Sequence, residues 1–137
     1  APLVAAVERF LAGPDARRAL ERLLPGALPR LGFGRSSNAF GPVAAYRGGE
    51  IRFNVAHRSF VRLARHEEPE RAARALLPVV AHELAHMCHE LHDLDFYRTS
   101  RAVLRALVGA AAAADARAYE EALAVGDPGD LGSEPSV

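Results

Sequence analysis

Residues 82–92 hold the side chains of this sequence that are best suited to chemistry. The segment reads HELAHMCHELH and contains four of the six histidines in the chain. On a helix, His82 and His86 lie one turn apart and project side by side, so both imidazoles can bind one cation. Glu83 is rotated by about 100° from His82 and lies beside such a cation, where its carboxylate can accept a proton. This spacing is the motif of zinc metallopeptidases.

Two histidines alone make an incomplete zinc site, so a third ligand is needed. His92 lies ten residues after His82 and is the third ligand that we predict. His89 is the alternative, but a straight helix would hold it too far along the axis. The predicted site is therefore Zn²⁺ bound by His82, His86 and His92, with Glu83 as the catalytic base. Three protein ligands leave a fourth position open, as catalytic zinc sites do.

The stretch HELAHMCHELHDLDFY resembles the signature HELxHxxxxxHxxxFW of the SprT, WLM and YgjP-like metallopeptidases. The third histidine, an acidic residue and an aromatic pair (Phe96 and Tyr97) stand where that signature has them. The resemblance covers residues 50–107 and implies a zincin-like fold with a polypeptide substrate. It also implies that the strand 51–56 is the edge strand with which a substrate pairs. The extended metzincin motif fits less well, because His89 stands where that motif has glycine and no methionine turn follows.

Other residues near the motif have structural roles in the simplest interpretation. Asp93 is expected to cap the next helix rather than to orient a ligand. Cys88 is expected to be a small buried hydrophobic residue. His57 lies outside the motif and is expected at the surface. The two tyrosines that could polarise a substrate carbonyl, but are more often core residues, are Tyr97 and Tyr119.

The elements that position these residues follow from apolar periodicity and from helix breakers. Helices are predicted over residues 3–11, 14–24, 59–65, 71–91, 96–108 and 110–124. The long helix over 71–91 carries the motif, and an acidic, proline-marked segment at 67–70 begins it. Pro78 inside this helix should kink it or split it in two.

Glycines and turn residues between Leu28 and Phe60 separate short segments with β character. Ile51, Phe53 and Val55 alternate with polar residues, which is the period of a half-buried strand. A Gly-Gly pair at 48–49 predicts a hairpin between this strand and residues 43–46.

The predicted fold class is α+β and zincin-like: a small antiparallel sheet whose edge strand packs on the active-site helix, with flanking helices. Residues 1–125 would form a single metallopeptidase domain. Residues 126–137 are rich in glycine, proline, serine and acidic residues and are expected to be a disordered tail.

Charge and composition limit the classes of partner that this domain is expected to bind. The 137-residue chain has a formal net charge of zero, and its 17 basic residues are scattered arginines, so this domain alone should bind nucleic acid weakly. The single cysteine excludes an internal disulfide, and neither a membrane-spanning run nor a signal peptide is visible, so a cytoplasmic location is expected. Because the sequence does not begin with methionine, either that residue was removed or the chain is part of a larger multidomain protein.

Two other functions are alternatives to a metallopeptidase. His57, the pair His92-Asp93, and Asp115 have a loose likeness to an HD-type phosphohydrolase, but those domains are all-helical, which conflicts with strands at 43–56. A non-catalytic zincin-like metal-binding or interaction module of a larger protein is the second alternative. Glu83 argues against it, because a structural site has no use for a general base.

Overall fold

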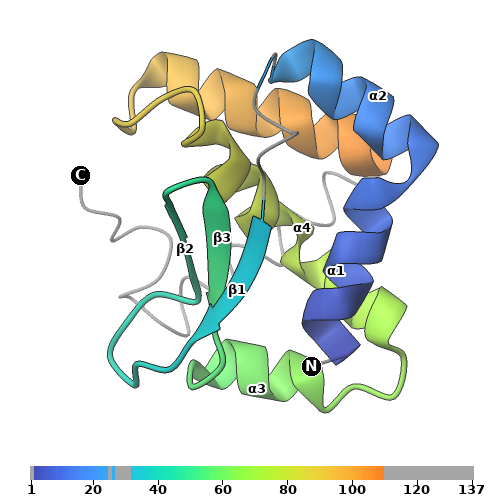
Figure 1. Cartoon of the computed structure of the whole chain (residues 1–137), viewed down its shortest axis with the longest axis vertical. Helices are drawn as coiled ribbons and strands as arrows, with labels where there is room; N and C mark the ends of the chain where they lie inside the picture. Colours follow the sequence, from blue (N-terminus) through green and yellow to red (C-terminus); the bar gives the residue numbers. More distant parts are fainter. Residues whose placement is uncertain (1, 25, 27–31, 110–137) are drawn as a thin grey trace.

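The computed structural model of the chain describes residues 2–24, 26 and 32–109, and this part has an α+β architecture, as predicted (Figure 1). In chain order the elements are α1 (Pro2–Ala12), α2 (Pro14–Leu23), β1 (Gly32–Ser36), β2 (Ala44–Arg47), β3 (Glu50–Asn54), α3 (Arg58–Ala64), α4 (Pro69–Ala85) and a last helix over residues 94–109. The helix predicted over 110–124 and the tail predicted over 126–137 lie outside the described residues.

The first two helices form where the periodicity predicts them. α1 buries Leu3, Val7 and Leu11 along one face, which is the spacing of an amphipathic helix, and packs along α4. Gly13 interrupts the helical pattern in an extended conformation, and Pro14 occupies the first turn of α2, where its missing N–H costs nothing.

The sheet has the strand order β1-β3-β2 and is mixed. β2 and β3 form the predicted antiparallel hairpin, and its turn residues Gly48 and Gly49 have φ angles of 60° and 83°, which glycine adopts without strain. β1, however, pairs with β3 in parallel. The prediction of an all-antiparallel sheet is therefore wrong. β1 and β2 run in opposite directions on either side of β3, so residues 37–43 can join them across the end of β3.

Asn54, at the end of β3, holds that connection in place. Its side-chain oxygen accepts from the backbone N–H groups of Asn38 and Ala56 at 3.0 and 3.1 Å. Its amide nitrogen donates to the carbonyls of Asn38 and Gly41 at 2.6 and 3.3 Å. One buried side chain therefore satisfies three backbone groups of the chain that leads into β2 and one just after β3.

The edge strand of the sheet is not the predicted one. β3, which contains Ile51 and Phe53, lies in the centre and ends at Asn54, so the expectation that residues 51–56 form the edge strand is wrong. Both apolar residues are fully buried, as their alternation predicts. β2 is the edge strand that packs on α4. Alternation of apolar residues identifies a strand but does not say which neighbour covers each of its edges.

α4 is the central helix of the fold and contacts α1, α3, β2 and β3. It begins at Pro69, as the acidic, proline-marked segment predicts, and runs through Pro78 without being split. Residues 76–85 are all buried, so packing on every side supports the helix where Pro78 cannot donate a hydrogen bond.

The end of α4 differs from the prediction, which carried the helix on to residue 91. α4 ends at Ala85, and the N–H groups of His86, Met87 and Cys88 each donate to the carbonyl three residues earlier, at 3.0–3.1 Å. This tightened turn ends the helix. The Asp93 carboxylate then accepts from the N–H of Phe96 at 2.9 Å and caps the next helix, as predicted. Residues 86–93 therefore form a connecting segment that reverses the chain.

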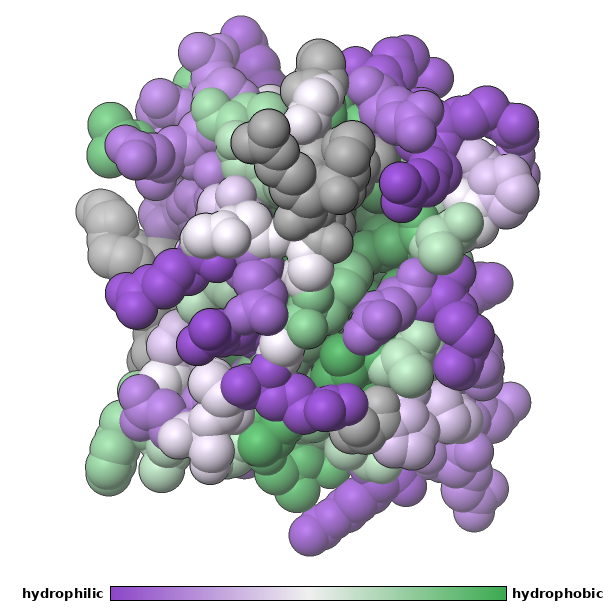
Figure 2. Space-filling model, in the orientation of Figure 1, coloured by the Kyte–Doolittle hydropathy of each residue, from purple (hydrophilic) through white to green (hydrophobic). Residues whose placement is uncertain are grey.

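Hydrophilic side chains cover most of the outer part of the face seen in Figure 2, and hydrophobic side chains gather towards its middle. Among the described residues, no helix combines the length and the apolar character that crossing a membrane requires.

Candidate metal centre

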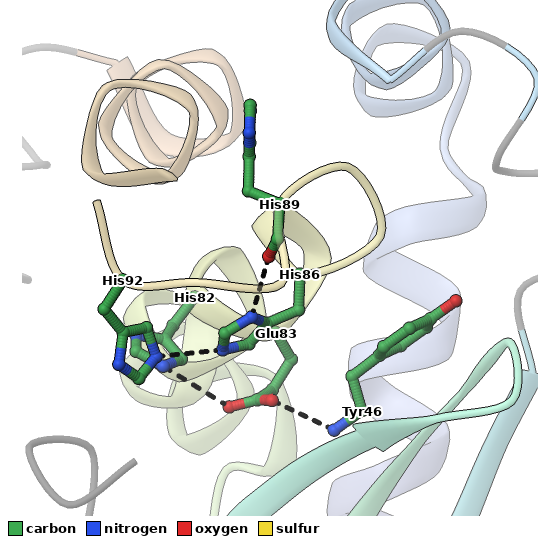
Figure 3. A network of polar contacts seen from close by, with 6 residues as sticks. All are labelled: Tyr46, His82, Glu83, His86, His89 and His92. Atoms are coloured by element: carbon green, nitrogen blue, oxygen red, sulfur yellow. Dashed lines mark hydrogen bonds and ion pairs between the residues drawn. The ribbon is translucent and has the colours of Figure 1, made fainter. Parts of the chain in front are cut away.

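Three imidazoles converge at the end of α4 (Figure 3). His82 projects from the last turn of α4, His86 caps that helix, and His92 comes from the connecting segment. One ring nitrogen from each of these residues lies within 4.8 Å of the other two. The structure thus brings together the three residues that the sequence predicts as ligands.

The donor set fits zinc. In a tetrahedral site with zinc–nitrogen bonds of about 2.0–2.1 Å, the ligand nitrogens are about 3.3–3.4 Å apart. The Nε2 atoms of His86 and His92 are already 3.1 Å apart. His82 is 5 % exposed, and the other two rings are half-buried, so a bound cation would be reachable from one side. Neutral imidazole nitrogens are also the ligands that zinc commonly takes in proteins.

His86 has a fixed orientation, because its Nδ1 lies 3.0 Å from the backbone carbonyl of His89. A carbonyl oxygen can only accept, so Nδ1 must carry the hydrogen of this bond. The Nε2 of His86 is then the nitrogen whose lone pair is directed at the centre. This is the outer hydrogen bond that metal-binding histidines usually make.

Glu83 lies beside the three imidazoles and is 1 % exposed. Its Oε1 accepts a hydrogen bond of 3.0 Å from the backbone N–H of Tyr46 in the edge strand β2 (Figure 3). Its Oε2 is 3.9 Å from Nε2 of His82. The sheet edge thus fixes one carboxylate oxygen and leaves the other directed at the histidines. A buried carboxylate in this position is compatible with a nearby cation.

Phe96 forms the apolar wall of the site. It is fully buried, and its ring centroid lies 4.8, 4.5 and 4.8 Å from those of His82, His86 and His92. Tyr97, the second aromatic of the motif, is 47 % exposed, and its ring lies 6.1 Å from that of His92. Tyr97 is therefore a residue at the rim of the site and not part of the core.

Two residues have surroundings that differ from those predicted. Cys88 is exposed and not buried, because the helix that would have turned it inward has already ended. His57 is 5 % exposed instead of lying at the surface. It precedes α3, and its Nδ1 accepts from the N–H of Ser59 at 3.1 Å, so it acts as the helix cap. Tyr119 and Asp115 lie outside the described residues.

Sequence reasoning missed three contributors to this site. They are the backbone N–H of Tyr46, the backbone carbonyl of His89 and the hydroxyl of Thr99, which lies 3.0 Å from Nε2 of His89. Two of the three are backbone groups, and no side-chain pattern could have indicated them. The hairpin prediction placed Tyr46 in a strand but gave no signal of which helix that strand faces.

No protein-family model matches this chain, and no match is found among curated proteins or among solved structures. The resemblance to the SprT signature therefore rests on the residues of the motif alone.

Proposed function

We propose that the chain is a zinc-dependent metallopeptidase. The observation that carries the proposal is the position of Glu83: a buried carboxylate, absent from the ligand group, whose Oε2 lies 3.9 Å from one of three clustered imidazoles. In the described residues the ligand group has three members, which leaves room for a water and a substrate. A structural zinc site would usually have a fourth protein ligand.

Each residue of the site has a defined part in such a reaction. Zinc held by the three histidines would act as a Lewis acid and bring the pKa of a bound water towards neutrality. Glu83 would accept the water proton at Oε2 and return it to the leaving amine. The Tyr46 N–H holds Oε1, which favours the orientation in which Oε2 faces the histidines. Phe96 excludes water behind the imidazoles, which strengthens the electrostatic interactions in front of them.

A polypeptide substrate is supported by the relation of β2 to Glu83. β2 is an edge strand of the described sheet, and the Tyr46 N–H that reaches Glu83 points away from β3. An extended peptide that adds to this edge would lie with its backbone beside the Glu83 carboxylate. Main-chain pairing of this kind accepts many sequences, so the proposed substrate class is unstructured polypeptide.

Substitution of Glu83 tests whether the chain is an enzyme or only a metal-binding module. Because Glu83 is not a ligand, Glu83→Gln should keep the fold and the zinc content. The loss of general-base help should slow the cleavage of an unstructured protein such as casein by about 10²–10⁴-fold. Glu90→Gln is the matched control, since Glu90 is an exposed glutamate of the connecting segment, and it should cleave casein like the wild type.

His86→Ala completes the comparison, because it should lose zinc and cleavage together. The peptidase proposal fails if zinc-loaded, folded wild type cleaves none of a varied set of unstructured proteins. It also fails if Glu83→Gln cleaves as fast as Glu90→Gln.

A further inference from the structure

His89 is the histidine of the motif that the proposed ligand group does not use. Its backbone carbonyl accepts a hydrogen bond from Nδ1 of His86, and its imidazole Nε2 lies 3.0 Å from the hydroxyl of Thr99 (Figure 3 shows the first of these). Thr99 belongs to the helix over residues 94–109. One residue therefore connects a predicted metal ligand at the end of α4 to the next helix.

We propose that His89 and Thr99 are positioning residues of the metal centre. Their hydrogen bond holds the connecting segment 86–93 in the conformation in which the His89 carbonyl orients His86. This inference rests on the proposed function, because it assumes that His86 and His92 bind the same zinc ion.

The His89 carbonyl selects one tautomer of His86. The bond to this carbonyl keeps the hydrogen on Nδ1 and the lone pair on Nε2, and Nε2 lies 3.1 Å from Nε2 of His92. If the carbonyl turned away, the other tautomer would put a hydrogen on Nε2 and block metal binding there. The position of a backbone carbonyl thus determines whether Nε2 of His86 has its lone pair available for zinc.

The carbonyl needs support, because it lies in a segment outside any helix. The start of the segment is held by the tightened last turn of α4, and its end by the Asp93 cap. Between these points, the His89 side chain bonds to Thr99. His92 is only three residues further along, so the same bond also restricts where its imidazole can lie.

Thr99 is well placed for this role. It follows Phe96 by three residues on one helix, so the two side chains share a face. Phe96 packs against all three imidazoles at 4.5–4.8 Å between ring centroids. The face that packs on the histidines therefore also carries the hydroxyl that holds the connecting segment. Thr99 and His89 are both half-buried, which protects their hydrogen bond from competition by water.

Threonine 99 offers a test in which no candidate ligand is changed. Thr99→Val removes the hydroxyl but keeps the shape, Thr99→Ser keeps the hydroxyl, and Ser100→Ala is a control on the same helix. Zinc affinity is measured by competition with a chromophoric chelator, and the absorption of the Co²⁺-loaded protein reports the coordination geometry. Thr99→Val and His89→Ala should bind zinc about 10–100-fold more weakly than the wild type, with an altered Co²⁺ spectrum. Thr99→Ser and Ser100→Ala should stay within about threefold of the wild type.

A second readout needs no metal. In the zinc-free protein, nitrogen-15 NMR should find His86 in the Nδ1–H tautomer, and Thr99→Val should shift it towards a mixture. The proposal is overturned if Thr99→Val keeps both the zinc affinity and the tautomer of the wild type. It is also overturned if His89→Ala abolishes zinc binding while Thr99→Val does not, because His89 would then be a ligand. Wild type that binds no zinc would refute the proposed function, whereas the tautomer would still test the role of Thr99.

Discussion

Glu83 is a buried carboxylate beside the proposed cation site. Burying a carboxylate costs several kcal/mol unless hydrogen bonds or opposite charge compensate for the lost water. The Tyr46 N–H donates a hydrogen bond of 3.0 Å to Oε1, and Nε2 of His82 lies 3.9 Å from Oε2. A divalent cation among the histidines would stabilise the charged carboxylate further, which gives a physical reason for a glutamate at this position of α4.

The assignment of His92 as a zinc ligand can also be tested with single substitutions. His92→Ala should reduce zinc affinity at least 100-fold, because it leaves two imidazoles where zinc needs three protein ligands. Cys88→Ser should bind zinc like the wild type, since Cys88 is exposed and outside the ligand group. Equilibrium zinc binding measured on both variants checks this. Comparable losses in the two variants would show that the cysteine is a ligand.

Single residues were predictable where chain geometry alone determines them. The one-turn spacing of His82 and His86 brings their rings together in any helix, so this pair of candidate ligands could be predicted from the sequence. The exposure of Cys88 and the burial of His57 depend on where α4 ends and on how α3 packs. Those are tertiary effects, and the sequence pattern around the two residues carries no signal of them.

At the scale of elements, the contact between β2 and the end of α4 is the decisive one. The Tyr46 N–H points away from β3, so a proline at this position would remove no hydrogen bond of the sheet. Tyr46→Pro should therefore leave the strand pairing and zinc in place, but it removes the donor to Oε1 of Glu83 and puts a ring carbon against that oxygen, so the carboxylate should move. We expect casein cleavage to fall by about tenfold or more, within the range for general-base catalysis.

Tyr46→Val is the control for this prediction, because it loses the aromatic ring but keeps the backbone N–H. Cleavage rates and zinc content are compared between the two variants. If Tyr46→Pro cleaves as fast as Tyr46→Val, the hydrogen bond from the sheet edge does not position the general base.

Element types were easier to predict than their connections. Periodicity and breakers indicated α1, α2, α3 and the β2–β3 hairpin, because each depends on local sequence. The parallel pairing of β1 was not predictable, since glycine-rich strands give little indication of their partners. The end of α4 was also missed. No glycine or proline stops that helix, and the Asp93 cap acts from the following element.

At the scale of the whole molecule, the site depends on four parts of the fold that pack together. α4 supplies His82 and Glu83, the sheet edge supplies the hydrogen bond to Glu83, and the helix over 94–109 supplies Phe96. The segment between the two helices brings in His92. Because ligands from separate elements meet only in the folded chain, zinc binding and folding should be coupled.

X-ray absorption at the zinc edge, recorded on the full chain loaded with one equivalent of zinc, tests most directly whether these histidines form a metal centre. We predict one tightly bound zinc per chain, four-coordinate, with imidazole scattering and only nitrogen or oxygen neighbours at about 2.0–2.1 Å. The His92→Ala chain should lose part of the imidazole signal or fail to retain the metal. A sulfur neighbour at about 2.3 Å, or wild-type protein that retains no zinc, would contradict the proposed site.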